Sequence, residues 1–158
     1  MSAFTEKSMK ISEITPTLDT LASKEFTHID YHDSFEIKGE FENINAFASH
    51  YFLSQPSWLS LISMNLFSKK SIQKAIEKSA FKKDTAIGVW KIYTRDDKEI
   101  VFGDDMGFME YRFFMLWIDK TKVRVGTVVQ YKGRFGKYYF ALVKLMHKKF
   151  IRMSLENL

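Results

Sequence analysis

The first regular pattern in the chain is an alternation of apolar and polar residues from Phe26 to Lys38, which is typical of a half-buried β-strand. Asp33 is the exception, because it falls on the apolar side of the predicted strand. The other residues of that side are Ile29, Tyr31, Phe35 and Ile37. A carboxylate among them needs a partner, since burying an unpaired charge is costly.

An uncharged stretch that begins at Asn43 predicts two buried helices meeting at Pro56. Asn43 is placed to cap the first helix, which we expect to end near Ser54. The second helix contains Trp58. Its continuation, Ser71–Phe81, places apolar and charged residues on opposite sides and is predicted to lie at the surface.

The pattern then returns to a two-residue period and predicts four strands with short turns between them. Short connections join antiparallel neighbours, so these strands form a meander. The predicted strands are Ile87–Thr94, Glu99–Asp104, Phe108–Ile118 and Lys122–Lys132. The inward residues of the last two are Met109, Tyr111, Phe113, Met115, Trp117, Val123, Val125, Thr127, Val129 and Tyr131.

The last stretch, Gly133–Leu158, predicts a long helix that is apolar over most of its circumference. We place Leu142 at the centre of its main apolar face and expect that face to lie on the sheet. Lys149 interrupts the same face. The first half of the helix is therefore expected to close the domain, and the basic last turns to be free.

The element order predicts an α+β fold in which a curved antiparallel sheet wraps the long C-terminal helix. Two helices separate the first strand from the meander. Residues 1–24 are polar and weakly periodic, and we expect a loosely ordered arm. Residues 25–158 are expected to form one domain.

Composition narrows the function classes. Phe, Tyr and Trp make up 16% of the chain, and such residues fill cores and line apolar pockets. The absence of cysteine excludes thiolate catalysis and cysteine-ligated metals. The net charge of +5 comes without any recognisable nucleic-acid-binding module, so we expect no nucleic-acid partner.

Neither a signal peptide nor a transmembrane segment is indicated, so we expect a cytoplasmic protein. We also expect no cofactor. The pattern leaves the oligomeric state open.

Several motifs, in order, resemble an uncharacterised bacterial family known only as a domain of unknown function. That family lies within the START/polyketide-cyclase-like (SRPBCC) superfamily. The residues that carry the resemblance are Tyr31-His32-Asp33-Ser34-Phe35, the segment around Trp58, Gly103-Asp104-Asp105, Glu110-Tyr111-Arg112, Gly126-Thr127-Val128-Val129, Gly133-Arg134 to Tyr139, His147 and Phe150-Ile151-Arg152. Gly107, Phe108, Leu145 and Met146 depart from the expected pattern. The resemblance implies a helix-grip fold with a cavity between sheet and helix, and no established reaction.

Four residues are candidates for acid–base chemistry: Asp33, Glu110, Arg112 and His147. Each also has a structural interpretation. Asp33 can form a buried ion pair, Glu110 and Arg112 can pair along one strand face, and His147 can be a packing residue. The His28-x-Asp30-x-His32 pattern resembles a metal site. Its three side chains lie along one flat, solvent-facing strand, so we predict no metal there.

Three functions remain open. The first is binding of a hydrophobic small molecule or lipid beneath the last helix. The walls of that cavity would be Tyr111, Phe113, Met115, Val125, Val129, Tyr139, Leu142 and Met146. The same residues can equally fill a solid core. The second is a cyclase- or hydrolase-type enzyme in the same cavity. The third is a peripheral membrane or protein-interaction module that uses the basic face of the helix, formed by Lys137, Lys144, Lys148 and Arg152.

Overall fold

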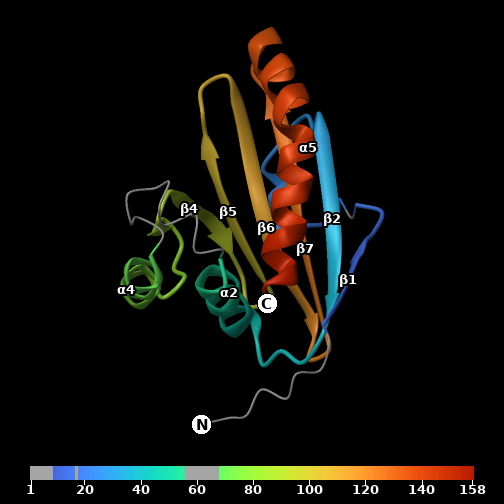
Figure 1. Ribbon diagram of the computed structural model, residues 1–158. Helices are drawn as coiled ribbons and strands as arrows, with labels where there is room; N and C mark the ends of the chain where they lie inside the picture. The colour runs from blue at the N-terminus through green and yellow to red at the C-terminus, as the bar shows by residue number, and fades with distance from the viewer. Residues whose placement is uncertain (1–8, 17, 56–67) are drawn as a thin grey trace.

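The computed structural model describes residues 9–16, 18–55 and 68–158. In chain order the elements are β1 (Lys10–Glu13), α1 (Leu21–Lys24), β2 (Tyr31–Lys38), α2 (Ile44–Leu53), α4 (Lys69–Ser79), β3 (Ala86–Ile87), β4 (Trp90–Arg95), β5 (Glu99–Asp105), β6 (Met109–Asp119), β7 (Lys122–Tyr131) and α5 (Arg134–Glu156) (Figure 1).

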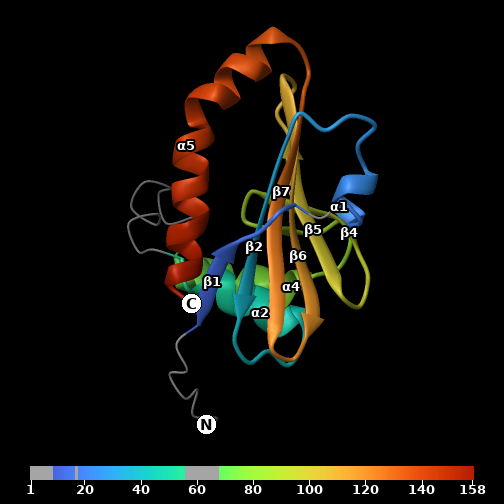
Figure 2. The same cartoon turned by 90° about the vertical axis from the view of Figure 1, so that its right-hand side faces the viewer.

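The strands form one antiparallel, curved sheet of seven strands in the order β1-β2-β7-β6-β5-β4-β3. β2 therefore lies beside the last strand, with Tyr31 opposite Val129 and Lys38 opposite Lys122. Figure 2 shows α5 on one side of the sheet and the short α1 on the other. Residues of α2, α4 and α5 share the main core on the α5 side. The fold is α+β, as the element order predicts.

The meander from β4 to β7 is confirmed, with small differences at the ends of its strands. The stretch predicted as one strand from Ile87 is divided into β3 and β4 at Gly88, whose φ of 62° favours glycine. Asn43 caps α2 as predicted, since its side-chain oxygen accepts a 2.9 Å hydrogen bond from the Ala46 amide. The predicted helix containing Trp58 lies outside the described residues.

The main core lies between the sheet and the α2/α5 layer and is rich in aromatic rings. Phe47 and Phe102 are fully buried there. Phe52 packs against Phe102 with ring centroids 5.1 Å apart, and Tyr51 lies 5.7 Å from Phe113. Part of the large aromatic content therefore fills the core, as expected for such side chains.

Two elements lie within the residues predicted to be a loose arm. β1 pairs with β2 along its whole length. α1 packs on the opposite face of the sheet, where the buried Glu99 carboxylate accepts hydrogen bonds from the amides of Leu21 and Ala22 at 2.9 and 3.2 Å. Burial raises the pKa of Glu99 although these two bonds favour its charged form.

α5 (Arg134–Glu156) forms within the predicted stretch Gly133–Leu158, but its orientation differs from the prediction. Phe140 and Ile151 face the sheet, whereas Leu142 and Met146 are exposed. Gly136 explains the rotation. A Cβ atom there would lie 2.0 Å from the Phe108 carbonyl oxygen, so the helix approaches β6 by a side that carries no side chain.

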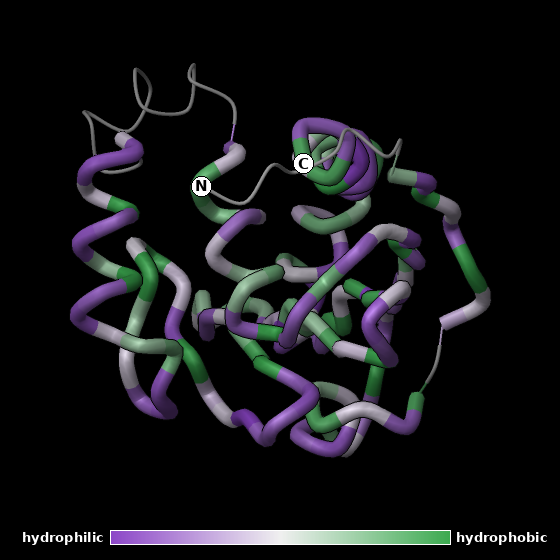
Figure 3. The backbone as a smooth tube through the Cα atoms, turned by 90° about the horizontal axis from the view of Figure 1, so that it is seen from below, coloured by the Kyte–Doolittle hydropathy of each residue, from purple (hydrophilic) through white to green (hydrophobic). Residues whose placement is uncertain are grey.

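The two halves of α5 also exchange the roles expected from the sequence. Ile151, Ser154 and Leu155 in the last turns are buried, and Ile151 and Leu155 belong to the main core. The first half carries exposed apolar residues instead. Figure 3 looks along α5 from below and shows polar and apolar segments around its axis. Because almost every side of this helix is apolar, the pattern of apolar residues could not identify the buried side.

Candidate functional site

The alternation of β2 and β7 brings one polar side chain from each strand to the α5 side of the sheet. Asp33 and Thr127 are opposite each other in the register. Both are almost completely buried, with Asp33 3% exposed. His147 reaches them from α5, because it lies one turn from Val143 and Ile151 on the side of the helix that faces the sheet.

Asp33 is held by three contacts. Its Oδ1 accepts a 2.9 Å hydrogen bond from the Thr127 amide, and its Oδ2 accepts a 2.8 Å hydrogen bond from the Tyr31 hydroxyl. His147 Nε2 lies 3.5 Å from the same Oδ2. The buried carboxylate is thus partnered by a backbone amide, a hydroxyl and an imidazole.

His147 links the carboxylate to the Thr127 hydroxyl. Nε2 lies 3.2 Å from Thr127 Oγ1, and this is the same nitrogen that faces Asp33. A serine-protease type of relay requires opposite ring nitrogens for the acid and the hydroxyl. The arrangement therefore fixes the imidazole and the hydroxyl in place but does not activate Thr127 as a nucleophile in that manner.

Tyr31 forms the outer part of this cluster. Burial, together with the neighbouring Asp33 carboxylate, raises the pKa of its hydroxyl far above the ordinary value. Its ring packs on Phe140 at 4.8 Å, and the Lys144 ammonium lies 5.2 Å from the ring centroid. Tyr31 is therefore a neutral hydrogen-bond donor to Asp33 at physiological pH.

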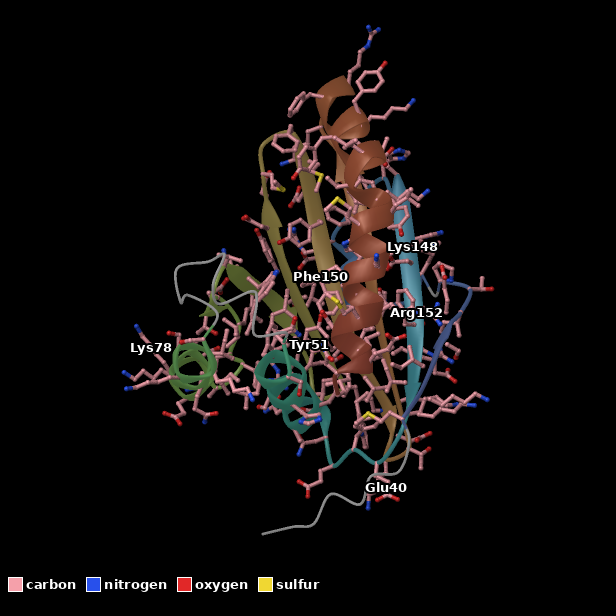
Figure 4. The ribbon with its side chains drawn as sticks, viewed as in Figure 1. Glu40, Tyr51, Lys78, Lys148, Phe150 and Arg152 are labelled. Carbon is pink, nitrogen blue, oxygen red and sulfur yellow. The ribbon has the colours of Figure 1, made fainter. Side chains whose placement is uncertain are left out.

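A cavity of about 200 Å³ lies beside the cluster, between the sheet, α2 and α5. Thr127 and His147 provide polar groups at its wall, and most of the other lining residues are apolar or aromatic. The full lining is Tyr51, Phe52, Trp90, Met109, Tyr111, Phe113, Thr127, Val129, Tyr139, Phe140, Val143, His147, Phe150 and Ile151. Figure 4 shows Phe150 on the side of α5 nearer Tyr51, and Lys148 and Arg152 on the other side.

Of the eight residues predicted to line a cavity, four do so: Tyr111, Phe113, Val129 and Tyr139. Met115 and Val125 are buried in the main core instead. Leu142 and Met146 lie on the exposed side of α5, because the helix is rotated relative to the prediction. Burial raises the pKa of Tyr51 and of Tyr111 to about 12, so both hydroxyls stay protonated at neutral pH.

Glu110 and Arg112 lie on the opposite face of the sheet from Asp33 and His147. Arg112 is buried and forms ion pairs with Glu110 at 2.6 Å and with Glu25 at 2.5 Å. Its guanidinium also stacks 3.5 Å from the centroid of the Tyr93 ring. These contacts fasten the segment after α1 to the sheet, so the pair does not contribute to the cavity.

The histidines of the His28-x-Asp30-x-His32 pattern do not converge. His28 contacts Asp30 at 2.8 Å, and the second oxygen of Asp30 accepts a 2.7 Å hydrogen bond from the Tyr131 amide. Asp30 thus fastens the start of β2 to β7. Within the described residues, no group of three His, Cys, Asp or Glu side chains is placed to hold a metal ion.

Thr127 and Tyr31 were not singled out from the sequence as site residues. One signal was available: Asp33 and Thr127 are isolated polar residues on apolar strand faces. Pairing of the first and last strands aligns them. Phe140 and Val143 carried no such signal, because any apolar residue of α5 could have faced the cavity.

Comparison with curated proteins and with solved structures found no match. In the described residues no helix is long and apolar enough to cross a membrane. A family pattern matches residues 26–153, which includes every residue of the Asp33–Thr127–His147 cluster and of the cavity. The chain therefore belongs to the family described as "Protein of unknown function (DUF2867)".

Proposed function

We propose that this protein binds a small, mostly apolar molecule in the cavity between the sheet and α5, with the polar group of that molecule at Thr127 and His147. The observation that carries this proposal is an apolar, aromatic cavity with a fixed polar cluster in its wall. Small-molecule sites commonly combine an apolar lining with a few precisely held polar groups.

The size of the cavity limits the ligand. An engineered cavity of about 150 Å³ holds one benzene molecule. A cavity of about 200 Å³ therefore suits a single ring with one or two small substituents, or a short branched chain. This volume favours a small molecule over a two-chain lipid.

The chemistry of the cluster favours a ligand with a hydroxyl or carbonyl group. The Thr127 hydroxyl and the His147 imidazole can each donate or accept a hydrogen bond. Asp33 lies behind them and is a positioning residue, since it holds the Thr127 backbone and faces Nε2. A buried, pre-oriented pair of this kind gives selectivity, because a ligand without the polar group would leave it unpaired.

We further infer that the architecture is the helix-grip type of START-like proteins. The long C-terminal helix against a curved antiparallel sheet supports this assignment. The position of the cavity between these two layers supports it as well.

The direct test uses p-cresol as a probe and measures its binding by saturation-transfer NMR and calorimetry. Val143→Trp should fill the cavity and abolish binding, because Val143 lines it. Leu142→Trp is the matched control: the same side chain is introduced one residue away at an exposed position and should leave binding unchanged. Equal binding by both variants, or none by the wild type, would contradict the proposal.

Native mass spectrometry of the protein as purified is the complementary measurement. A retained molecule of about the size of the cavity is the expected finding, and it should be absent from Val143→Trp. The mass of the retained molecule would also distinguish a substituted ring from an acyl chain.

Acid–base catalysis on the bound molecule is the second candidate function. The observation in its favour is the His147 imidazole, which lies in the cavity wall 3.5 Å from the buried Asp33 carboxylate. If His147 acts this way in a hydrolysis, the molecule retained by His147→Gln should gain the mass of one water molecule on incubation with the wild type. His147→Gln should still bind p-cresol but should leave that mass unchanged.

A further inference from the structure

The outer side of the first half of α5 carries a continuous apolar surface. Five residues form this apolar stripe: Phe135, Tyr138, Leu142, Leu145 and Met146. Each is between 64% and 79% exposed. Their spacing places them on one side of the helix. Single exposed apolar residues are common, but a contiguous group on one helix indicates a contact surface.

The stripe dominates the exposed apolar surface of the described part of the chain. The other large apolar side chains exposed there are Leu18, Val89 and Met106, which lie in separate segments. At one end of the stripe, Phe135 packs edge-on against Phe108 at 4.9 Å. This contact anchors the end of the stripe to the residue that precedes β6.

The net positive charge of the chain is concentrated on the same helix. α5 contains six basic residues (Arg134, Lys137, Lys144, Lys148, Lys149 and Arg152) and one acidic residue, Glu156. The chain has 24 basic and 19 acidic residues in total, so 18 of each sign remain outside α5 and balance. The entire formal excess of +5 is therefore carried by this helix.

Most of the basic residues border the stripe along one side of the helix. At about 100° per residue, Arg134 and Arg152 lie roughly 80° from Leu142 around the helix, and Lys149 lies within the line of the stripe. An apolar surface beside a basic surface is the arrangement of helices that lie in the plane of a lipid–water interface. The basic side chains then meet anionic headgroups while the apolar ones enter the acyl boundary.

From these features we propose that α5 docks the protein on an anionic lipid surface through the stripe Phe135–Tyr138–Leu142–Leu145–Met146. A second copy of the chain fits less well, because pairing two such helices would bring two groups of excess positive charge together. Figure 2 shows α5 along one edge of the molecule, with its outer side turned away from the sheet. A membrane surface accepts such a ridge without needing a complementary groove.

The proposal is independent of the cavity ligand. The surface binding concerns exposed side chains of α5, whereas the cavity is lined by the opposite side of the helix. Failure of one test therefore leaves the other unaffected.

The experiment is flotation of the full chain with vesicles of phosphatidylglycerol and phosphatidylcholine in equal parts, compared with vesicles of phosphatidylcholine alone. The wild type should bind the anionic vesicles at least about tenfold more tightly, since several basic residues contribute at such a surface. The double variant Leu142→Glu with Leu145→Glu should weaken binding by about tenfold or more, because each leucine loses its buried apolar area.

The matched control is Leu18→Glu with Val89→Glu, which changes the net charge equally but lies outside the stripe. It should retain most of the binding, and circular dichroism checks that both variants are folded. Equal losses in the two double variants would overturn the role of the stripe. Equal binding to both vesicle types would overturn the role of charge. A concentration-dependent dimer that the stripe variant abolishes, without vesicle binding by the wild type, would replace lipid by a second copy.

Discussion

Replacing Asp33 by alanine removes the group that connects β2, β7 and α5 in the candidate site. The carboxylate accepts hydrogen bonds from the Thr127 amide and the Tyr31 hydroxyl and faces His147 Nε2. Thr127 is 1% exposed, so its amide cannot turn to water when the acceptor is lost. Asp33→Ala therefore leaves at least one buried donor without a partner.

The expected cost follows from these donors. An orphaned buried polar group costs about 1–3 kcal/mol, so losing the acceptor of the Thr127 amide should cost about that much, and the half-buried Tyr31 hydroxyl adds a smaller amount. Removing the charge also relieves its desolvation, which lowers the net figure. Asp33→Asn keeps an oxygen for the Thr127 amide and should cost less, about 1 kcal/mol.

Urea unfolding followed by circular dichroism measures both variants. The expected order of stability is wild type, then Asp33→Asn, then Asp33→Ala. Asp19→Ala is the control, because that exposed aspartate forms a surface ion pair with Lys24 and its loss should change little. An Asp33→Ala variant as stable as the wild type would refute the reasoning, since desolvation would then outweigh the hydrogen bonds.

Two further variants test the packing and ionisation described above. Gly136→Ala should destabilise the protein by about 1–3 kcal/mol, because the new Cβ would meet the Phe108 carbonyl and force α5 away from the sheet. The control Ala141→Gly lies on the exposed side of α5 and should lower the free energy of unfolding by only about 1 kcal/mol. The folded pKa of Tyr51, about 12, lies above its ordinary value of 10.0, so the unfolded chain loses this proton first as pH rises. The contribution of Tyr51 to stability should be complete below pH 10 and fall by about 3 kcal/mol towards pH 12, in addition to losses from Tyr31 and Tyr111, whose pKa values are also raised. In Tyr51→Phe this contribution should vanish, whereas Tyr138→Phe should unfold with alkali like the wild type.

The sequence predicted the element order because local signals determine it. The Asn43 cap, the turn residues and the two-residue alternation act within a few residues of one another. The same alternation places Tyr111 and Phe113 on one strand face and Glu110 and Arg112 on the other. Which pair faces α5 depends on the strand register, which the sequence alone leaves open. In the structure Tyr111 and Phe113 face α5, and Arg112 pairs with Glu25 on the opposite face.

The site was less accessible to sequence reasoning, because it depends on the rotation of one helix. Phe135 and Leu142 are as apolar as Phe140 and Ile151, so hydrophobicity could not decide which pair is buried. The close approach at Gly136 decides it, and this contact involves the backbone of a distant residue. The sequence marks Asp33 as a polar residue on an apolar strand face. Its partners can be identified only once β2 is known to pair with β7.

The position of β2 in the sheet also bears on how the protein folds. β4 to β7 pair with their neighbours in sequence, whereas β2 pairs with β7 across 84 to 98 residues, from Lys38 opposite Lys122 to Tyr31 opposite Val129. Because closing a long loop costs entropy before the contacts form, we expect the meander to assemble first and β2 to join late. Asp33 arrives with β2, so a partly folded chain would have Thr127 in place but lack the carboxylate that orients it.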